Sequence, residues 1–142
     1  MSEQQELSAA IARALTPLPE VRAALLFGSR ARGRARANSD IDVAVLLDPA
    51  LAPSDARARL VRLLDALNSE LAADLVDLVI LNDAPPALAF QVLKYGLVAF
   101  ERDRVDLHRF RVRTYSLHAD YEPVERFFRE VTQKRVLGGG RG

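Results

Sequence analysis

The chain has 142 residues, of which 49% are hydrophobic and 27% charged, values typical of one globular domain with a buried core. Its 20 basic residues nearly balance its 19 acidic ones, so the net charge of +1 gives no general attraction to nucleic acid or membrane surfaces. The absence of cysteine excludes disulfides and thiolate metal sites, and no apolar run reaches the ~18 residues of a membrane span. The first residues lack the pattern of a signal peptide, so we expect a cytoplasmic protein.

The first third of the chain alternates between helical and strand patterns. Apolar residues recur at helical spacing over 7–15, and two apolar runs of strand length cover 21–27 and 41–47. Between these strands, residues 29–33 could form a short helix that Gly33 ends, and the stretch "ANSD" indicates a turn.

The remaining patterns predict a helix over 55–71, a strand over 75–81, a helix over 86–94 and a strand over 97–100. Ser54 is a suitable N-cap for the first of these helices. Its predicted apolar face consists of Leu60, Leu63, Leu64 and Leu67. From about 102 to 137 the chain is again helical in pattern, with an interruption at Pro123, and 138–142 are expected to be a disordered tail. This order of elements predicts an α/β or α+β domain.

Three acidic residues lie on or beside the second and third predicted strands. Asp40 and Asp42 flank Ile41, so their side chains share one face of the strand, with Cα atoms ~6.5–7 Å apart. Asp77 interrupts an apolar run, and it completes a three-carboxylate cluster if the two strands are neighbours. Such oxygen ligands suit Mg²⁺ or Mn²⁺, and two ions ~3.5–4 Å apart serve phosphoryl or nucleotidyl displacement. The alternative is that the first two acids form a solvated strand end and that Asp77 faces water at an edge.

A Gly-Ser pair and several arginines separate the first two strands. Gly28 lets the backbone approach a ligand closely, and Ser29 with free N–H groups at a helix start can bind phosphate oxygens. Ten residues lie between Ser29 and Asp40. Four arginines occupy alternate positions: Arg30, Arg32, Arg34 and Arg36. The first two are candidates for phosphate contacts, because guanidinium matches phosphate in a bidentate fork. The last two are expected to be solvated or to contact an acidic partner.

The spacing of Gly28, Ser29, Asp40 and Asp42 resembles the signature of the DNA polymerase β-like nucleotidyltransferase superfamily. More narrowly, the chain from about 21 to 131 resembles the MntA-type minimal nucleotidyltransferases. The resemblance implies a single nucleotidyltransferase-fold domain over 1–137, with a small mixed β-sheet flanked by helices and a C-terminal helical extension.

The resemblance also implies roles for the candidate site residues. Gly28 and Ser29 would hold the triphosphate of ATP, Asp40 and Asp42 would bind two Mg²⁺ ions, and Asp77 would bind the catalytic metal. The family's proteins are antitoxins paired with a HEPN-domain ribonuclease, and some transfer AMP from ATP to a tyrosine of that toxin. We therefore expect a HEPN-family toxin as partner, without direct nucleic-acid or membrane binding.

Two other functions remain open at this stage. A small-molecule nucleotidyltransferase of the antibiotic-modifying kind usually has a second domain, and the 42 residues after Phe100 are too few for one. A non-catalytic antitoxin could instead mask its partner. The C-terminal stretch supplies apolar residues for such binding or for self-association: Val105, Phe110, Val112, Tyr115, Leu117, Tyr121, Val124, Phe127, Phe128 and Val131.

Overall fold

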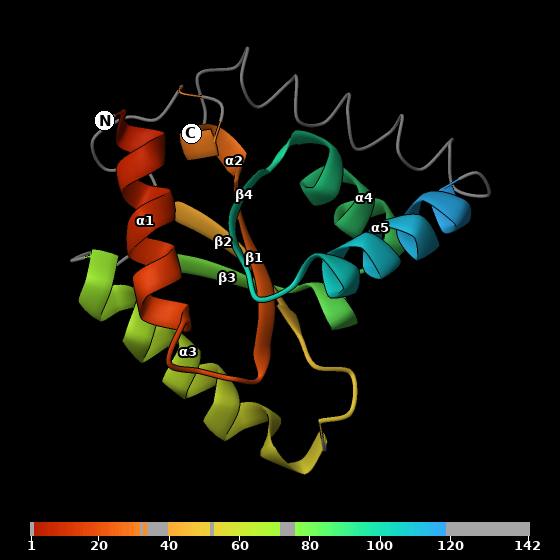
Figure 1. The fold of residues 1–142 in the computed structure, drawn as a ribbon, viewed down its shortest axis with the longest axis horizontal. Coiled ribbons are helices and arrows are strands. Elements are labelled where there is room, and N and C mark those ends of the chain that lie inside the picture. Colours follow the sequence, from red (N-terminus) through yellow and green to blue (C-terminus); the bar gives the residue numbers. More distant parts are fainter. Residues whose placement is uncertain (1, 32, 34–39, 52, 72–75, 119–142) are drawn as a thin grey trace.

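A computed structural model describes residues 2–31, 33, 40–51, 53–71 and 76–118 of the chain (Figure 1). Its elements are α1 (Glu3–Leu15), β1 (Val21–Phe27), α2 (Gly28–Ala31), β2 (Ile41–Leu47), α3 (Ala56–Leu71), β3 (Val76–Ile80), α4 (Pro86–Tyr95), β4 (Leu97–Glu101) and α5 (Arg104–His118). Two 3₁₀ turns, Pro53–Asp55 and Leu81–Asp83, precede α3 and α4. The alternation of helices and strands that the sequence predicts is confirmed across this part of the chain.

The four strands form one mixed sheet in the order β3-β2-β1-β4. The central strand β1 is antiparallel to both β2 and β4, whereas β3 is parallel to β2. A parallel neighbour requires a crossover connection, and α3 supplies it between β2 and β3. One face of the sheet packs against α1 and α3 and the other against α4 and α5, so the sheet lies between two helical layers (Figure 1).

Two helices begin at different residues from those that the apolar pattern predicts. The helix predicted from residue 7 begins at Glu3, because Ser2 Oγ accepts from the Gln5 backbone N–H at 3.1 Å and Gln5 Oε1 accepts from the Ser2 N–H at 2.9 Å. The helix predicted from residue 55 begins at Ala56, because a 3₁₀ turn over Pro53–Asp55 precedes it. Polar side chains and turns therefore set these boundaries.

The buried face of α3 differs from its predicted leucine stripe. On the predicted leucine face, Leu63 and Leu67 are buried, Leu64 is half-buried and Leu60 is 39% exposed. Arg59 takes a buried position on this helix, at 7% exposure. A long arginine stem can cover apolar surface, which an apolar pattern alone does not register.

The other boundaries shift by small amounts. The third strand ends at Ile80 because Leu81 begins a 3₁₀ turn, and α4 and β4 extend to Tyr95 and Glu101. The predicted C-terminal helix is confirmed over Arg104–His118. The interruption at Pro123 and the tail at 138–142 lie outside the described residues. Among the helices of the described segments, none is long and apolar enough to cross a membrane.

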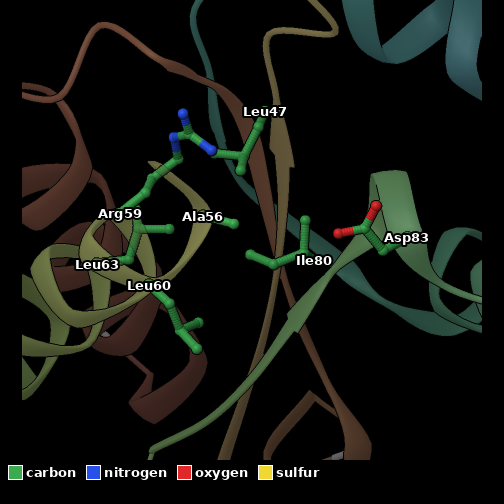
Figure 2. Close-up of a pocket in the computed structure, with 7 residues that line it drawn as sticks. All are labelled: Leu47, Ala56, Arg59, Leu60, Leu63, Ile80 and Asp83. Carbon is green, nitrogen blue, oxygen red and sulfur yellow. The ribbon is translucent and has the colours of Figure 1, made fainter. Parts of the chain in front are cut away.

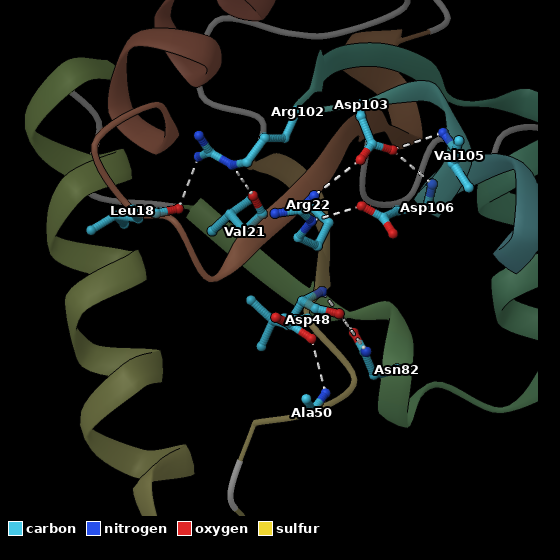
Figure 3. Close-up of polar contacts among 11 residues, drawn as sticks. Leu18, Val21, Arg22, Asp48, Ala50, Asn82, Arg102, Asp103, Val105 and Asp106 are labelled. Carbon is cyan, nitrogen blue, oxygen red and sulfur yellow. Dashed lines mark hydrogen bonds and ion pairs between the residues drawn. The ribbon is translucent and has the colours of Figure 1, made fainter.

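Arg102, directly after β4, ties the end of α1 to the start of β1 (Figure 3). Its Nε donates to the Val21 carbonyl at 2.8 Å, and its Nη2 lies 3.0–3.2 Å from the carbonyls of Leu15, Thr16 and Leu18. The last carbonyls of a helix have no partner within the helix. The guanidinium of Arg102 therefore satisfies backbone acceptors at the C-terminal end of α1.

A second arginine anchors α5 to the sheet (Figure 3). Arg22 of β1 donates from Nε to Asp106 at 2.7 Å and from Nη2 to Asp103 at 3.1 Å. Asp103 Oδ1 also accepts from the backbone N–H groups of Val105 and Asp106, so it caps the start of α5. The hydrogen bond from the Asp106 N–H contributes most to lowering the pKa of Asp103, because it stabilises the charged carboxylate.

Replacing Arg102 with alanine is expected to lower the free energy of unfolding by about 2–3 kcal/mol, because several backbone carbonyls lose a charged donor. Arg102→Lys should recover only part of this loss, because the lysine ammonium keeps a charged donor but lacks the planar fork of the guanidinium. Arg13→Ala, which removes an exposed pair with Glu70, should cost less than about 1 kcal/mol. Chemical denaturation of the three variants measures these values, and an Arg102→Ala variant as stable as Arg13→Ala would contradict the role of Arg102.

Candidate active site

The pairing of three strands brings two of the predicted acids together. Asp42 of β2 pairs with Asp77 of parallel β3 and, on its other side, with Phe27 at the end of β1. Paired residues on neighbouring strands lie about 5 Å apart and extend their side chains from the same face of a sheet. The two carboxylates therefore occupy adjacent positions on the face that α4 and α5 cover, near one end of the sheet.

The three acids differ in their surroundings. Asp42 is half-buried, whereas Asp77 is exposed because β3 is an edge strand. The alternative that Asp77 faces water is thus correct about its exposure, yet the sheet places it beside Asp42. Asp40 is half-buried and directly precedes β2. Within the described segments, no three His, Asp or Glu side chains are already gathered closely enough to enclose a metal ion.

Gly28 lies directly against the carboxylate of Asp42. Its φ of 73° is in the left-handed region, which residues with a side chain rarely adopt. A Cβ placed on Gly28 would overlap Asp42 Oδ2 and would lie 3.0 Å from Cγ of the same side chain. Both the backbone angle and the space require glycine here, so the turn after β1 and the carboxylate of β2 are in contact.

The predicted short helix between the first two strands is α2, in which Ser29 is the second residue. Gly33 has a φ of 70° and donates its N–H to the Arg30 carbonyl at 3.3 Å, as expected for a residue that ends a helix. Arg30 Nη1 lies 2.9 Å from Glu3 Oε1 of α1. A phosphate contact of Arg30 stays a prediction, and Arg32 lies outside the described residues, as do the two arginines that follow it.

A small hollow occurs at the other end of the same strands (Figure 2). It has a volume of about 50 Å³ and is lined by Leu47, Ala56, Arg59, Leu60, Leu63, Ile80 and Asp83. Leu47 and Ile80 are the last residues of β2 and β3, whereas Asp42 and Asp77 lie near the first residues of these strands. Because sites for drug-sized ligands enclose about 300–1,000 Å³, this hollow is too small for a nucleotide.

Two residues that contact the site region carry no recognisable pattern in the sequence. Glu3 and Gln4, in the first turn of α1, contact Arg30 and Ala31 of α2 across 27 residues. Sequence periodicity reports only on the element to which a residue belongs, so it gives no signal for a contact between two helices.

A mixed sheet with a glycine turn after its first strand and carboxylates on the two adjoining strands defines a nucleotidyltransferase-type α/β domain. Residues 9–105 match the family described as Polymerase beta, Nucleotidyltransferase. This match covers more than half of the chain, and the chain belongs to that family. The superfamily resemblance and the fold class inferred from the sequence are thereby confirmed.

The chain also resembles individual known proteins and solved structures. The chain is 29% identical over 131 residues to the protein adenylyltransferase MntA of Aphanizomenon flos-aquae (strain 2012/KM1/D3). This alignment covers 89% of this chain and 85% of the relative. It resembles a chain of the crystal structure of a toxin–antitoxin with AMP-PNP, with 31% identity, a TM-score of 0.65, and 89% of this chain and 98% of the other covered. A structure of the tri-AMPylated Shewanella oneidensis HEPN toxin in complex with MNT antitoxin matches with 29% identity, a TM-score of 0.61, and 92% and 98% coverage.

Gly28 and Gly33, the glycines with positive φ in the described part of the chain, provide a matched test of the contact with Asp42. Gly33→Ala should lower the free energy of unfolding by about 1–2 kcal/mol, the cost of a left-handed backbone. Little steric cost is added, because the nearest atom to the new Cβ is the flexible end of Gln4. Gly28→Ala has the same backbone cost and also displaces the Asp42 carboxylate, so it should cost at least about 1 kcal/mol more. Urea denaturation measures both values, and equal losses would contradict the contact.

Proposed function

We propose that this protein is the antitoxin of a HEPN toxin–antitoxin pair and that it transfers AMP from ATP to a tyrosine hydroxyl of the partner toxin. The relatives support this proposal, because one is named a protein adenylyltransferase and another was solved with an AMPylated HEPN toxin. The match to a structure with AMP-PNP supports ATP as the substrate. We accordingly place the protein in the cytoplasm, where ATP is available.

The contact of Gly28 with Asp42, beside Asp77, is the observation that carries the proposal. Transfer of a nucleotidyl group needs a triphosphate and its metal ions at adjacent positions, because the ions would offset the negative charge of the phosphates. A turn without a side chain lets the triphosphate approach the backbone of Gly28 while the neighbouring carboxylate holds a cation. The closeness of Gly28 to the Asp42 side chain supports this arrangement.

The residues present fit two Mg²⁺ ions, or Mn²⁺ in their place. The donors are carboxylate oxygens, which hard divalent cations prefer, and like charges on neighbouring strands repel unless a cation lies between them. We assign both ions to Asp40 and Asp42 and the catalytic ion also to Asp77. When bound, these ions neutralise the triphosphate charge and lower the pKa of the acceptor hydroxyl.

The chain's own residues then have separate tasks. Gly28 and Ser29 hold the triphosphate so that its α-phosphorus faces the acceptor, and Arg32 is a candidate for additional positive charge. Asp77 is exposed at the sheet edge, where an acceptor carried by another protein can reach it, and it takes the proton of the tyrosine hydroxyl. The tyrosine oxygen forms a bond to the α-phosphorus, the bond to the bridging oxygen breaks, and pyrophosphate leaves.

Asp42→Asn should abolish transfer of α-labelled AMP to the purified HEPN partner, and Asp40→Asn should do the same, because each removes a shared metal ligand. We expect a loss of at least about 100-fold, the lower range for removing a single stabilising group at an active site. Asp65→Asn, on the exposed side of α3, is the matched control and should transfer normally. Transfer at the control rate by either variant would contradict the proposed site.

The same variants separate catalysis from masking of the partner. Asp42→Asn protein is mixed with the toxin at equal stoichiometry, and cleavage of the toxin's RNA substrate is followed. The proposal predicts that the toxin stays active, because no AMP reaches its tyrosine. Full inhibition by this variant would instead show that binding alone neutralises the toxin.

A further inference from the structure

We infer that the first turn of α1 positions the phosphate-binding turn, with Glu3 and Gln4 as positioning residues that act through α2. This inference rests on the proposed nucleotide site at Gly28 and Ser29. It concerns residues that precede position 9, where the match to the nucleotidyltransferase family begins. The range of this chain that matches the family therefore does not include them.

Two polar contacts connect α1 to the far end of α2. Glu3 Oε1 lies 2.9 Å from Arg30 Nη1, and Gln4 Nε2 donates to the Ala31 carbonyl at 3.2 Å. Gln4 Nε2 also lies 3.3 Å from the position that a Cβ on Gly33 would take. The start of α1 and the short helix α2 thus lie side by side, as Figure 1 shows. The first turn of α1 holds both a side chain and a backbone carbonyl of α2.

The helix α2 depends on such support because it is only one turn long. It has four residues, and forming a first helical turn fixes several backbone angles for little hydrogen bonding. Gly28 begins it and Gly33 follows it, and glycine backbones lose more conformational freedom on folding than other residues do. Contacts from outside the helix therefore help to hold α2, including the N–H groups that the proposed function assigns to the triphosphate.

The Arg30 side of the pair with Glu3 is shielded from water, whereas the Glu3 side chain is 59% exposed. The Arg30 side chain is 13% exposed, whereas Arg13 in the pair with Glu70 is 61% exposed. A charged hydrogen bond orients its donor, so Glu3 restricts the position of a guanidinium that is itself mostly shielded from water. Arg30 accordingly acts on the nucleotide through the position of α2.

The supporting turn of α1 is held by contacts of its own. The capping box of Ser2 and Gln5 fixes the start of the helix, and Ile11 and Leu15 further along it are completely buried. Glu3 and Gln4 therefore extend from an element that is anchored at both ends. A positioning contact must come from a well-anchored element, because a side chain that moves freely could not restrict α2.

Glu3→Gln tests the inference, with Glu6→Gln as the matched control that removes the same charge from the same turn. Calorimetric titration with AMP-PNP and Mg²⁺ should show about two- to fivefold weaker binding for Glu3→Gln, the range expected for one partly exposed ion pair, and unchanged binding for Glu6→Gln. Hydrogen exchange of the peptide over 28–31 should become faster only in Glu3→Gln, which a general loss of stability would not produce.

The Arg30→Gln variant and the double variant Glu3→Gln/Arg30→Gln show whether Arg30 acts through α2. If it does, the double variant binds AMP-PNP no more weakly than Arg30→Gln alone, because the same contact is already lost. Additive losses would overturn the inference and make Arg30 a direct phosphate ligand. Equal or tighter binding by Glu3→Gln would also overturn it. Wild-type protein that binds no AMP-PNP would overturn the proposed function itself.

Discussion

The contact between Gly28 and the carboxylate of Asp42 is the constraint on which the candidate site depends. Gly28 follows β1 directly with a left-handed backbone, and any side chain there would overlap Asp42. Because β1 and β2 are antiparallel neighbours, the end of one strand meets the beginning of the other. The sheet therefore brings a turn suited to phosphate and an acid suited to a cation into direct contact.

The surrounding fold supports this contact from several directions. The crossover through α3 returns the chain parallel to β2, so Asp77 reaches the position beside Asp42. The first turn of α1 holds α2 through Glu3 and Gln4. Arg102 in turn fixes the other end of α1 to the sheet, so both ends of this helix are tied to the strands or to the turn between them. The contacts that stabilise the fold thus also maintain the geometry of the site.

The sequence predicts the parts of the molecule that depend on local patterns. The order of elements and the family follow from apolar periodicity and from the spacing of Gly28, Ser29, Asp40 and Asp42, because neighbours along the chain determine both. Contacts between distant elements carry no such pattern. The supports by Glu3 and Arg102, and the burial of Arg59 on α3, were therefore not predictable.

A crystal structure of the protein with AMP-PNP, Mn²⁺ and the HEPN toxin that we propose as its partner tests the central claim most directly. Manganese gives an anomalous signal, so its position can be assigned independently of the protein atoms. The account predicts manganese peaks at the carboxylates of Asp42 and Asp77, and triphosphate density against the backbone of Gly28. Manganese and triphosphate bound at another place on the chain, with Asp42 and Asp77 unoccupied, would contradict it.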